Sequence, residues 1–201
     1  MGRYALMIIG LTGKSCSGKN RVAELLDENV FTVIDEDKLG HAALSANVDK
    51  IREAFGDDVI GSDNLVDRKK LGPIVFSSEK NLETLNSISH PWMVEETLRM
   101  AKDIEESGKV AVINAAILEQ MGFVEHCDEI LLVISDYENR LKRAQARDGI
   151  TKEAFDKRTS AQKNIGESLF SSGKRVITII NNGTEDALSR QIKNYCDSIK
   201  K

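Results

Sequence analysis

The sequence holds few of the residues that cross-link or bend a chain. Among its 201 residues only three are cysteine, two are proline and one is tryptophan. The cysteines, Cys16, Cys127 and Cys196, are odd in number and widely spaced, which fits neither a disulfide framework nor a zinc site. We therefore expect reduced thiols and a cytoplasmic protein.

Long apolar runs and an excess of positive charge are also missing. The longest apolar runs, such as Ile130–Ile134, are far shorter than the ~20 residues that a membrane-spanning helix needs. The 28 Lys and Arg residues are outnumbered by 32 Asp and Glu, so the net charge is −4. A general nucleic-acid binder would be basic. We expect neither a membrane nor a nucleic-acid partner, and the sequence carries no signal for an oligomeric state.

Short runs rich in Val and Ile alternate with amphipathic helical patterns along much of the chain. The expected strands are Ala5–Leu11, Val30–Ile34, Val110–Ala115, Glu129–Ser135 and Arg175–Ile180. The expected helices between and after them are Lys19–Glu28, Tyr137–Arg147 and Glu185–Ile199, the last with Thr184 as N-cap. Most of these strands lack the alternation of a half-solvated strand. The pattern predicts an α/β fold with a five-stranded parallel sheet flanked by helices.

Two stretches do not follow that alternation. Residues 41–108 are too long for one crossover and predict helices over Ala46–Phe55, Ser78–Ser89 and Pro91–Glu106, with Pro91 at a helix start. Residues 148–172 are polar and cationic, as a mobile lid would be. The alternative for both stretches is a solvated helical addition without a functional role.

The strongest motif is Gly13-Lys14-Ser15-Cys16-Ser17-Gly18-Lys19-Asn20, which follows an apolar strand and opens a helix. It meets seven of the eight places of the phosphate-loop pattern G-x-x-x-x-G-K-[ST]. The glycines let successive N–H groups point at phosphate oxygens, and Lys19 is placed to reach the β- and γ-phosphates of ATP. The alternative is a glycine-rich turn whose lysine is merely solvated.

Asn20 is the one departure from that pattern, since a hydroxyl at its place usually ligates Mg²⁺. An amide carbonyl oxygen is a weaker but feasible ligand for such a hard cation. We therefore name Asn20 as the candidate metal ligand and Mg²⁺ as the expected cofactor.

Further motifs follow the loop in a fixed order. They are Asp35-Glu36-Asp37, Asp67-Arg68 with Leu71 and Val75-Phe76, His90-Pro91, Ala115-Ala116-Ile117-Leu118-Glu119, Arg143 with Arg147-Asp148-Gly149, and Asn181-Asn182-Gly183. In this order and spacing the chain resembles the dephospho-CoA kinase family over nearly its full length. Asn20, and Asn114-Ala115-Ala116 in place of a proline-containing run, depart from that family's pattern.

The resemblance implies transfer of the γ-phosphoryl group of ATP to the ribose 3′-hydroxyl of dephospho-CoA, which yields coenzyme A and ADP. It also implies one P-loop NTPase-type domain with a core at about 1–40, 109–139 and 173–201. The helical CoA-binding insertion would be about 41–108 and the lid about 140–172. Two other functions stay open: another small-molecule kinase of this fold, and a catalytically impaired nucleotide-binding protein, which Asn20 would explain.

By the same resemblance, Asp37 is the candidate general base, because a carboxylate at the end of a strand can take the proton of the acceptor hydroxyl. Asp35 either orients water or metal or caps a helix, and the sequence leaves these equal. The candidate acceptor-binding residues are Asp35, His41, Arg68, His90 and Glu119. His90 also has a structural interpretation, as the residue that caps the helix expected to start at Pro91.

The candidate ATP-binding residues extend beyond the loop to Arg21, Arg143, Arg147 and Asn182. Arg140, Arg143 and Arg147 share one helical face. We expect Arg143 or Arg147 to bind phosphate, whereas the alternative is a solvated cationic face. Asn182 either contacts adenine or belongs to a turn.

Overall fold

The computed structural model describes residues 7–160, 162, 165–166 and 168–199. The chain divides into two compact units. Unit 1 consists of Met1–Ile34 and Ala101–Lys201, and unit 2 of Asp35–Met100.

Unit 1 is built on a five-stranded sheet in the order β2-β3-β1-β4-β5. The strands are β1 (Ile8–Thr12), β2 (Phe31–Asp35), β3 (Val110–Asn114), β4 (Glu129–Ile134) and β5 (Arg175–Ile180). β1 pairs in parallel with both β3 and β4, and β4 pairs in parallel with β5. The predicted α/β fold is confirmed. The part of the first expected strand before Met7 lies outside the described residues.

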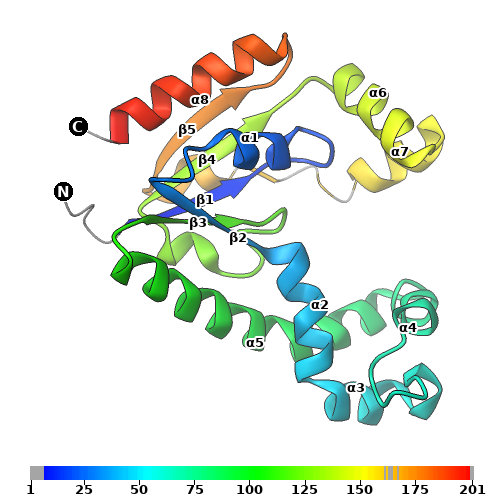
Figure 1. Cartoon of the computed structure of the whole chain (residues 1–201). Coiled ribbons are helices and arrows are strands. Elements are labelled where there is room, and N and C mark those ends of the chain that lie inside the picture. The colour runs from blue at the N-terminus through cyan, green and yellow to red at the C-terminus, as the bar shows by residue number, and fades with distance from the viewer. Residues whose placement is uncertain (1–6, 161, 163–164, 167, 200–201) are drawn as a thin grey trace. The chain divides into compact units, whose positions relative to one another are not determined.

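Helices α1 (Lys19–Leu25) and α8 (Glu185–Ile199) cover one face of this sheet (Figure 1). Val22 of α1 and Ile192 of α8 are fully buried in a core that includes Ile9, Leu11 and Leu131 of the strands. On the opposite face a Cβ at Gly10 would lie 2.7 Å from Leu118 Cδ2, so the segment after β3 packs directly on the β1 backbone. Thr184 Oγ1 accepts from the Ala187 N–H at 3.3 Å, which is the expected cap of α8.

The polar stretch after β4 forms helices α6 (Tyr137–Asp148) and α7 (Lys152–Ser160) and the short 3₁₀ turn η3 (Ser168–Ser171). Another 3₁₀ turn, η2 (Phe123–His126), precedes β4. Phe155 of α7 is fully buried against Leu141 and Ala144 of α6, and Cys16 packs at the edge of this cluster. This apolar contact fixes α7 on α6 within the stretch that the sequence predicts to be a lid.

Unit 2 is helical. It contains α2 (Glu36–Ala46), α3 (Val48–Phe55), the 3₁₀ turn η1 (Asp57–Val59), α4 (Arg68–Val75) and the first part of α5 (Glu79–Glu106). Its core gathers Ile51, Val59, Leu71 and Val75. The sequence analysis missed α2 and α4, whose first turns are capped by Asp35 and Asp67.

The prediction of separate helices before and after Pro91 is wrong, because α5 runs through Pro91 without a break. His90 accordingly lies inside a helix instead of capping one. Ser89, Met93 and Thr97 are buried at a spacing of four residues, while Pro91 faces solvent. The continuous buried stripe outweighs the one backbone hydrogen bond that proline removes. None of the helices in the described part of the chain has the length and apolarity that a bilayer crossing requires.

Candidate functional site

The phosphate loop joins β1 to α1, and its backbone needs both glycines. Gly18 has φ +98°, and a Cβ there would lie 2.0 Å from Asn181 Nδ2. A Cβ at Gly13 would lie 2.5 Å from the Val133 carbonyl oxygen. Cys16 also adopts a positive φ, of 61°. The loop is therefore a tight, close-packed curl at the N-terminus of a helix, which is the geometry that binds phosphate.

Asn114, at the end of β3, connects the last two residues of the loop motif. The Lys19 ammonium donates to Asn114 Oδ1, and Asn114 Nδ2 donates to Asn20 Oδ1 at 3.3 Å. Asn114 is only 4% exposed. The sequence analysis did not name it as a site residue. The available signal was an amide at the C-terminal end of an otherwise apolar strand that neighbours β1.

The side chains around Asn20 decide how Mg²⁺ could be held there. No three His, Cys, Asp or Glu side chains among the described residues gather closely enough to hold a metal ion. Mg²⁺ at kinase sites keeps several waters and is bound mainly by substrate phosphates. A single amide oxygen that Asn114 holds beside Lys19 fits that mode of binding, so Asn20 remains the candidate ligand.

Arg143 donates hydrogen bonds to backbone carbonyls of the phosphate loop. Its Nη1 donates to the Cys16 and Ser17 carbonyls at 3.2 and 3.3 Å and to Ser135 Oγ at 2.9 Å. Its Nη2 donates to the Asn181 carbonyl at 2.8 Å, and Asn181 Nδ2 donates in turn to the Ser17 carbonyl at 2.8 Å. These contacts hold loop carbonyls away from the site, as a curl with inward N–H groups requires.

The other predicted ATP-binding residues have different surroundings. Arg147 forms an ion pair with Asp148 at 2.7 Å, and Arg158 shares that carboxylate at 2.7 Å. Hydrogen bonds from these two arginines hold the pKa of Asp148 well below its usual range. Arg21 pairs with Glu185 and Glu24, which raises the pKa of its guanidinium, and Asn182 Oδ1 accepts from the Asp136 N–H at 2.7 Å.

Hydrogen bonds at Gln162 and Glu119 connect the stretch after α7 to other parts of unit 1. Gln162 Oε1 accepts from the Ser15 N–H at 2.8 Å, so a side-chain carbonyl oxygen bonds to a loop amide. Glu119, a predicted acceptor-binding residue, accepts from the Gly166 N–H at 3.1 Å and from the Ser168 hydroxyl. The sequence analysis did not single out Gln162.

Unit 2 brings four predicted residues to one pocket of about 530 Å³. Asp37 and His41 of α2, Arg68 of α4 and His90 of α5 all line it, together with apolar side chains. Asp35 does not line the pocket. Its Oδ1 accepts from the Asp37 N–H at 3.1 Å and the Lys38 N–H at 3.4 Å, so it serves as a helix cap. Burial lowers the pKa of His90.

Comparison with known proteins supplies the family. The family model for dephospho-CoA kinase matches residues 7–186. The chain belongs to the dephospho-CoA kinase family. A curated dephospho-CoA kinase from Fusobacterium nucleatum is 34% identical, with 97% of this chain and 100% of the relative covered. A dephospho-CoA kinase from Geobacillus kaustophilus is 34% identical, over 92% of this chain and 93% of the relative.

Solved structures share the fold of this chain. A Thermus thermophilus protein matches with a TM-score of 0.77 and 27% identity, over 96% of this chain and 97% of that one. The fold also matches a Campylobacter jejuni dephospho-CoA kinase, with a TM-score of 0.68 and 22% identity, over 97% of this chain and 98% of that one. An Acinetobacter baumannii shikimate kinase shares the fold at a TM-score of 0.53 and 19% identity, over 98% and 94%. Membership of the family makes the chain a kinase, and the solved structures show that it has the P-loop kinase fold.

Proposed function

We propose that this chain transfers the γ-phosphoryl group of Mg²⁺-bound ATP to the ribose 3′-hydroxyl of dephospho-CoA, which gives coenzyme A and ADP, in the cytoplasm. One observation carries the proposal beyond family membership. Asp37, His41, Arg68 and His90 come from three segments that are far apart in the sequence, yet they line one pocket of unit 2. The exposed Asp37 carboxylate, a guanidinium and two imidazoles, beside the buried Glu36 and an apolar floor, suit a phosphate-bearing acceptor.

The nucleotide side of the reaction rests on the phosphate loop. The inward N–H groups and the N-terminus of α1 would hold the β- and γ-phosphates of ATP. Lys19, steadied by Asn114, would neutralise charge on the oxygens of the transferred group as the bond to the β-phosphate breaks. Mg²⁺, when bound at Asn20, would supply further neutralisation of the phosphates.

The acceptor side rests on Asp37. The 3′-oxygen forms a bond to the γ-phosphorus, the bond from that phosphorus to the β,γ-bridging oxygen breaks, and Asp37 takes the hydroxyl proton. Asp37 lies in the first turn of α2 and is exposed to the pocket, so its carboxylate can meet a hydroxyl. Arg68 would hold an acceptor phosphate. Burial lowers the pKa of His90 and so favours its neutral imidazole, which can serve as a hydrogen-bonding group.

The test is turnover by the purified chain with ATP and Mg²⁺, followed as ADP release and as coenzyme A by mass spectrometry. We expect turnover of dephospho-CoA and none of its 3′-deoxy analogue. Lys19→Ala should abolish turnover, whereas the matched control Lys142→Ala, at an exposed site on α6, should retain it. The proposal fails if nucleoside monophosphates are phosphorylated and dephospho-CoA is not.

A further inference from the structure

Cys16 stands in the middle of the phosphate loop, and no step of the proposed reaction uses its thiol. Its backbone has a φ of 61°, in the left-handed region that few residues other than glycine adopt. The residue is half-buried, and its Sγ lies 3.7 Å from Ser15 Oγ. By contrast, Cys127 is 1% exposed and Cys196 is 5% exposed. Cys16 is therefore the thiol of this chain that a small reagent can reach most easily.

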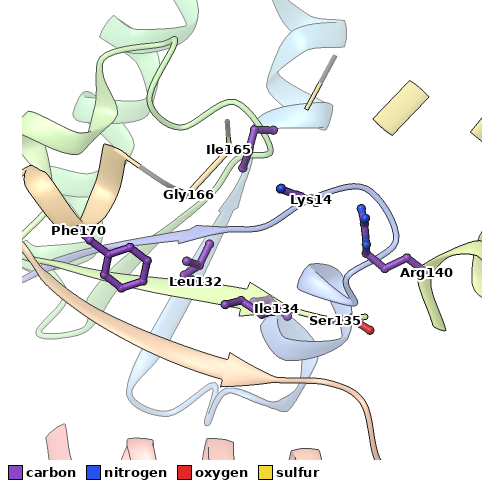
Figure 2. A pocket seen from close by; sticks show the side chains of 9 residues that line it. Lys14, Leu132, Ile134, Ser135, Arg140, Ile165, Gly166 and Phe170 are labelled. Carbon is purple, nitrogen blue, oxygen red and sulfur yellow. The ribbon is translucent and has the colours of Figure 1, made fainter. Parts of the chain in front are cut away.

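The guanidinium of Arg140 lies beside this cysteine. Figure 2 shows Arg140 reaching from the first turn of α6 toward the phosphate loop. Its Nη1 donates to the carbonyl of Ser15, the residue directly before Cys16, at 3.4 Å. Its guanidinium carbon lies 5.7 Å from the centre of the Phe155 ring, and Cys16 packs against the apolar cluster that contains Phe155. Burial lowers the pKa of Arg140, and the charge of an ionised Cys16 raises it, as expected of close neighbours.

Arg140 has an unused hydrogen-bond donor at this place. The residue is only 8% exposed, and its Nε is buried without a hydrogen-bond partner among the described residues. Arg140 also lines a pocket of about 440 Å³, whose described lining residues include no Asp or Glu. A buried guanidinium with an unused N–H favours an anionic acceptor. A thiol is a poor acceptor, whereas an anionic oxygen bound to the same sulfur is a strong one.

We propose that Cys16 is a site of reversible oxidation by hydroperoxides, which turns its thiol into a sulfenate held by Arg140 and weakens the binding of ATP. The Cys16 thiolate attacks one oxygen of hydrogen peroxide, so that an S–O bond forms while the O–O bond breaks. Two electrons pass from sulfur to the peroxide, and the leaving hydroxide takes up the proton that the thiol released, which gives water. The sulfenic acid loses its proton to solvent, and its oxygen accepts the unused N–H of Arg140.

A low-molecular-weight thiol reverses this oxidation. Its sulfur attacks the sulfur of the sulfenic acid, and the oxygen leaves as water, which gives a mixed disulfide. A second thiol attacks that disulfide and forms a small disulfide with the first, which releases the Cys16 thiolate. The oxidation is therefore a switch that a reducing compartment resets.

The oxidised sulfur would oppose ATP binding through its charge. The phosphate loop attracts anions through its inward N–H groups. A sulfenate in the middle of that loop adds a negative charge close to the place of the β- and γ-phosphates, and like charges repel strongly at a partly buried site. The inference goes beyond the proposed reaction, because it concerns the nucleotide whichever acceptor is phosphorylated.

The first test locates the oxidation in the full native chain. The chain is treated with hydrogen peroxide in the presence of dimedone, which traps sulfenic acids, and the labelled cysteines are quantified by peptide mass spectrometry. We expect Cys16 to be labelled at least tenfold faster than Cys127 and Cys196, because these two are buried and burial raises the pKa of Cys127 to about 12. Equal labelling of the three cysteines, or none at Cys16, would overturn the proposal.

Arg140→Gln tests the cation, with Lys142→Ala as the matched control on the same helix. Arg140→Gln should slow the labelling of Cys16 about tenfold, because the anionic forms of the sulfur lose their partner. Lys142→Ala, at an exposed site, should leave that rate unchanged. A native rate in Arg140→Gln refutes the role of Arg140. If this variant does not fold, the ranking of the three cysteines in the native chain still decides.

The second test measures the affinity for Mg²⁺–ATP by calorimetry before peroxide, after peroxide, and again after dithiothreitol. The native chain should lose about tenfold or more in affinity and regain it with dithiothreitol. Cys16→Gly, which suits the left-handed backbone, should bind ATP equally well before and after peroxide. Equal losses in the two chains, or no loss in the native chain, would overturn the proposal.

Neither test depends on turnover, so this proposal and the proposed function fail separately. A native chain that does not phosphorylate dephospho-CoA, but whose Cys16 is labelled and whose ATP affinity falls with peroxide, refutes the function and supports the switch. A chain that turns over dephospho-CoA at the same rate and binds ATP equally well with and without peroxide refutes the switch and leaves the function standing.

Discussion

Replacing Arg143 by alanine should destabilise unit 1 through the phosphate loop. Hydrogen bonds from a charged donor contribute about 1.5–3 kcal/mol each. Arg143 makes two short ones, to the Asn181 carbonyl at 2.8 Å and Ser135 Oγ at 2.9 Å, and longer ones to the Cys16 and Ser17 carbonyls. Because the side chain is only half-buried, the lower value applies to each of the two short bonds, so their loss should cost about 3 kcal/mol of unfolding free energy. For a chain of this length that lowers Tm by roughly 6–12 °C.

The assay is urea and thermal unfolding followed by circular dichroism, with Arg147→Ala as the matched control. Arg147 is exposed and pairs with Asp148 at the surface, so its loss should cost less than about 1 kcal/mol. Arg143→Lys should recover only part of the stability, because a single ammonium group cannot reach all the acceptors that the two terminal nitrogens of the guanidinium contact. If Arg143→Ala leaves Tm unchanged but raises the KM for ATP strongly, Arg143 is a phosphate ligand, and the idea that it stabilises the phosphate loop is refuted.

Three further predictions concern the site. Asp37→Asn should lower kcat by about 10²–10⁴-fold at saturating Mg²⁺ with little change in ATP affinity. If this variant instead weakens Mg²⁺–ATP binding and keeps its kcat, Asp37 acts near the metal and is not the general base. Asn20→Ser should shift the Mg²⁺ concentration for half-maximal rate and leave the KM for dephospho-CoA alone; an unchanged metal titration would exclude Asn20. Burial lowers the pKa of His90, so as the pH falls through about 6.5 the unfolded chain binds a proton at this residue more readily than the folded chain does. The free energy of unfolding of the native chain should therefore fall in this pH range. It should fall less in His90→Gln. Parallel Tm curves for the two chains between pH 7.5 and 5.5 would contradict this.

The sheet followed from the sequence because its strands are continuous apolar runs with turn signals between them. β5 was predicted at its observed bounds, and the observed β2 to β4 lie within a residue of theirs. Unit 2 was harder to predict. Its helices are short and mostly exposed, so α4 carries a proline and two lysines where apolar periodicity would be expected. At Pro91 the local rule for proline favoured a break, but burial of Ser89, Met93 and Thr97 along one face decided the outcome.

Site residues that belong to a local motif could be predicted from the sequence. The roles of residues whose partners are distant in the sequence could not. The loop needed only its own eight residues. The role of Asn114 depends on the adjacency of β1 and β3, a pairing between residues about a hundred positions apart. Arg143 lies on the helical face that the sequence indicated, yet only the fold shows that its partners are loop carbonyls. Likewise Asp35 shows its capping role only once α2 is seen to begin directly after β2.

The most direct test of the proposed reaction is the position of the new phosphate in the product. Dephospho-CoA incubated with ATP, Mg²⁺ and the purified chain should give a product whose ¹H–³¹P correlation joins the new phosphorus to the ribose 3′ proton. The same mixture with Lys19→Ala should contain unchanged dephospho-CoA. A correlation to the 2′ proton, or ADP release without any phosphorylated acceptor, would contradict the proposed function.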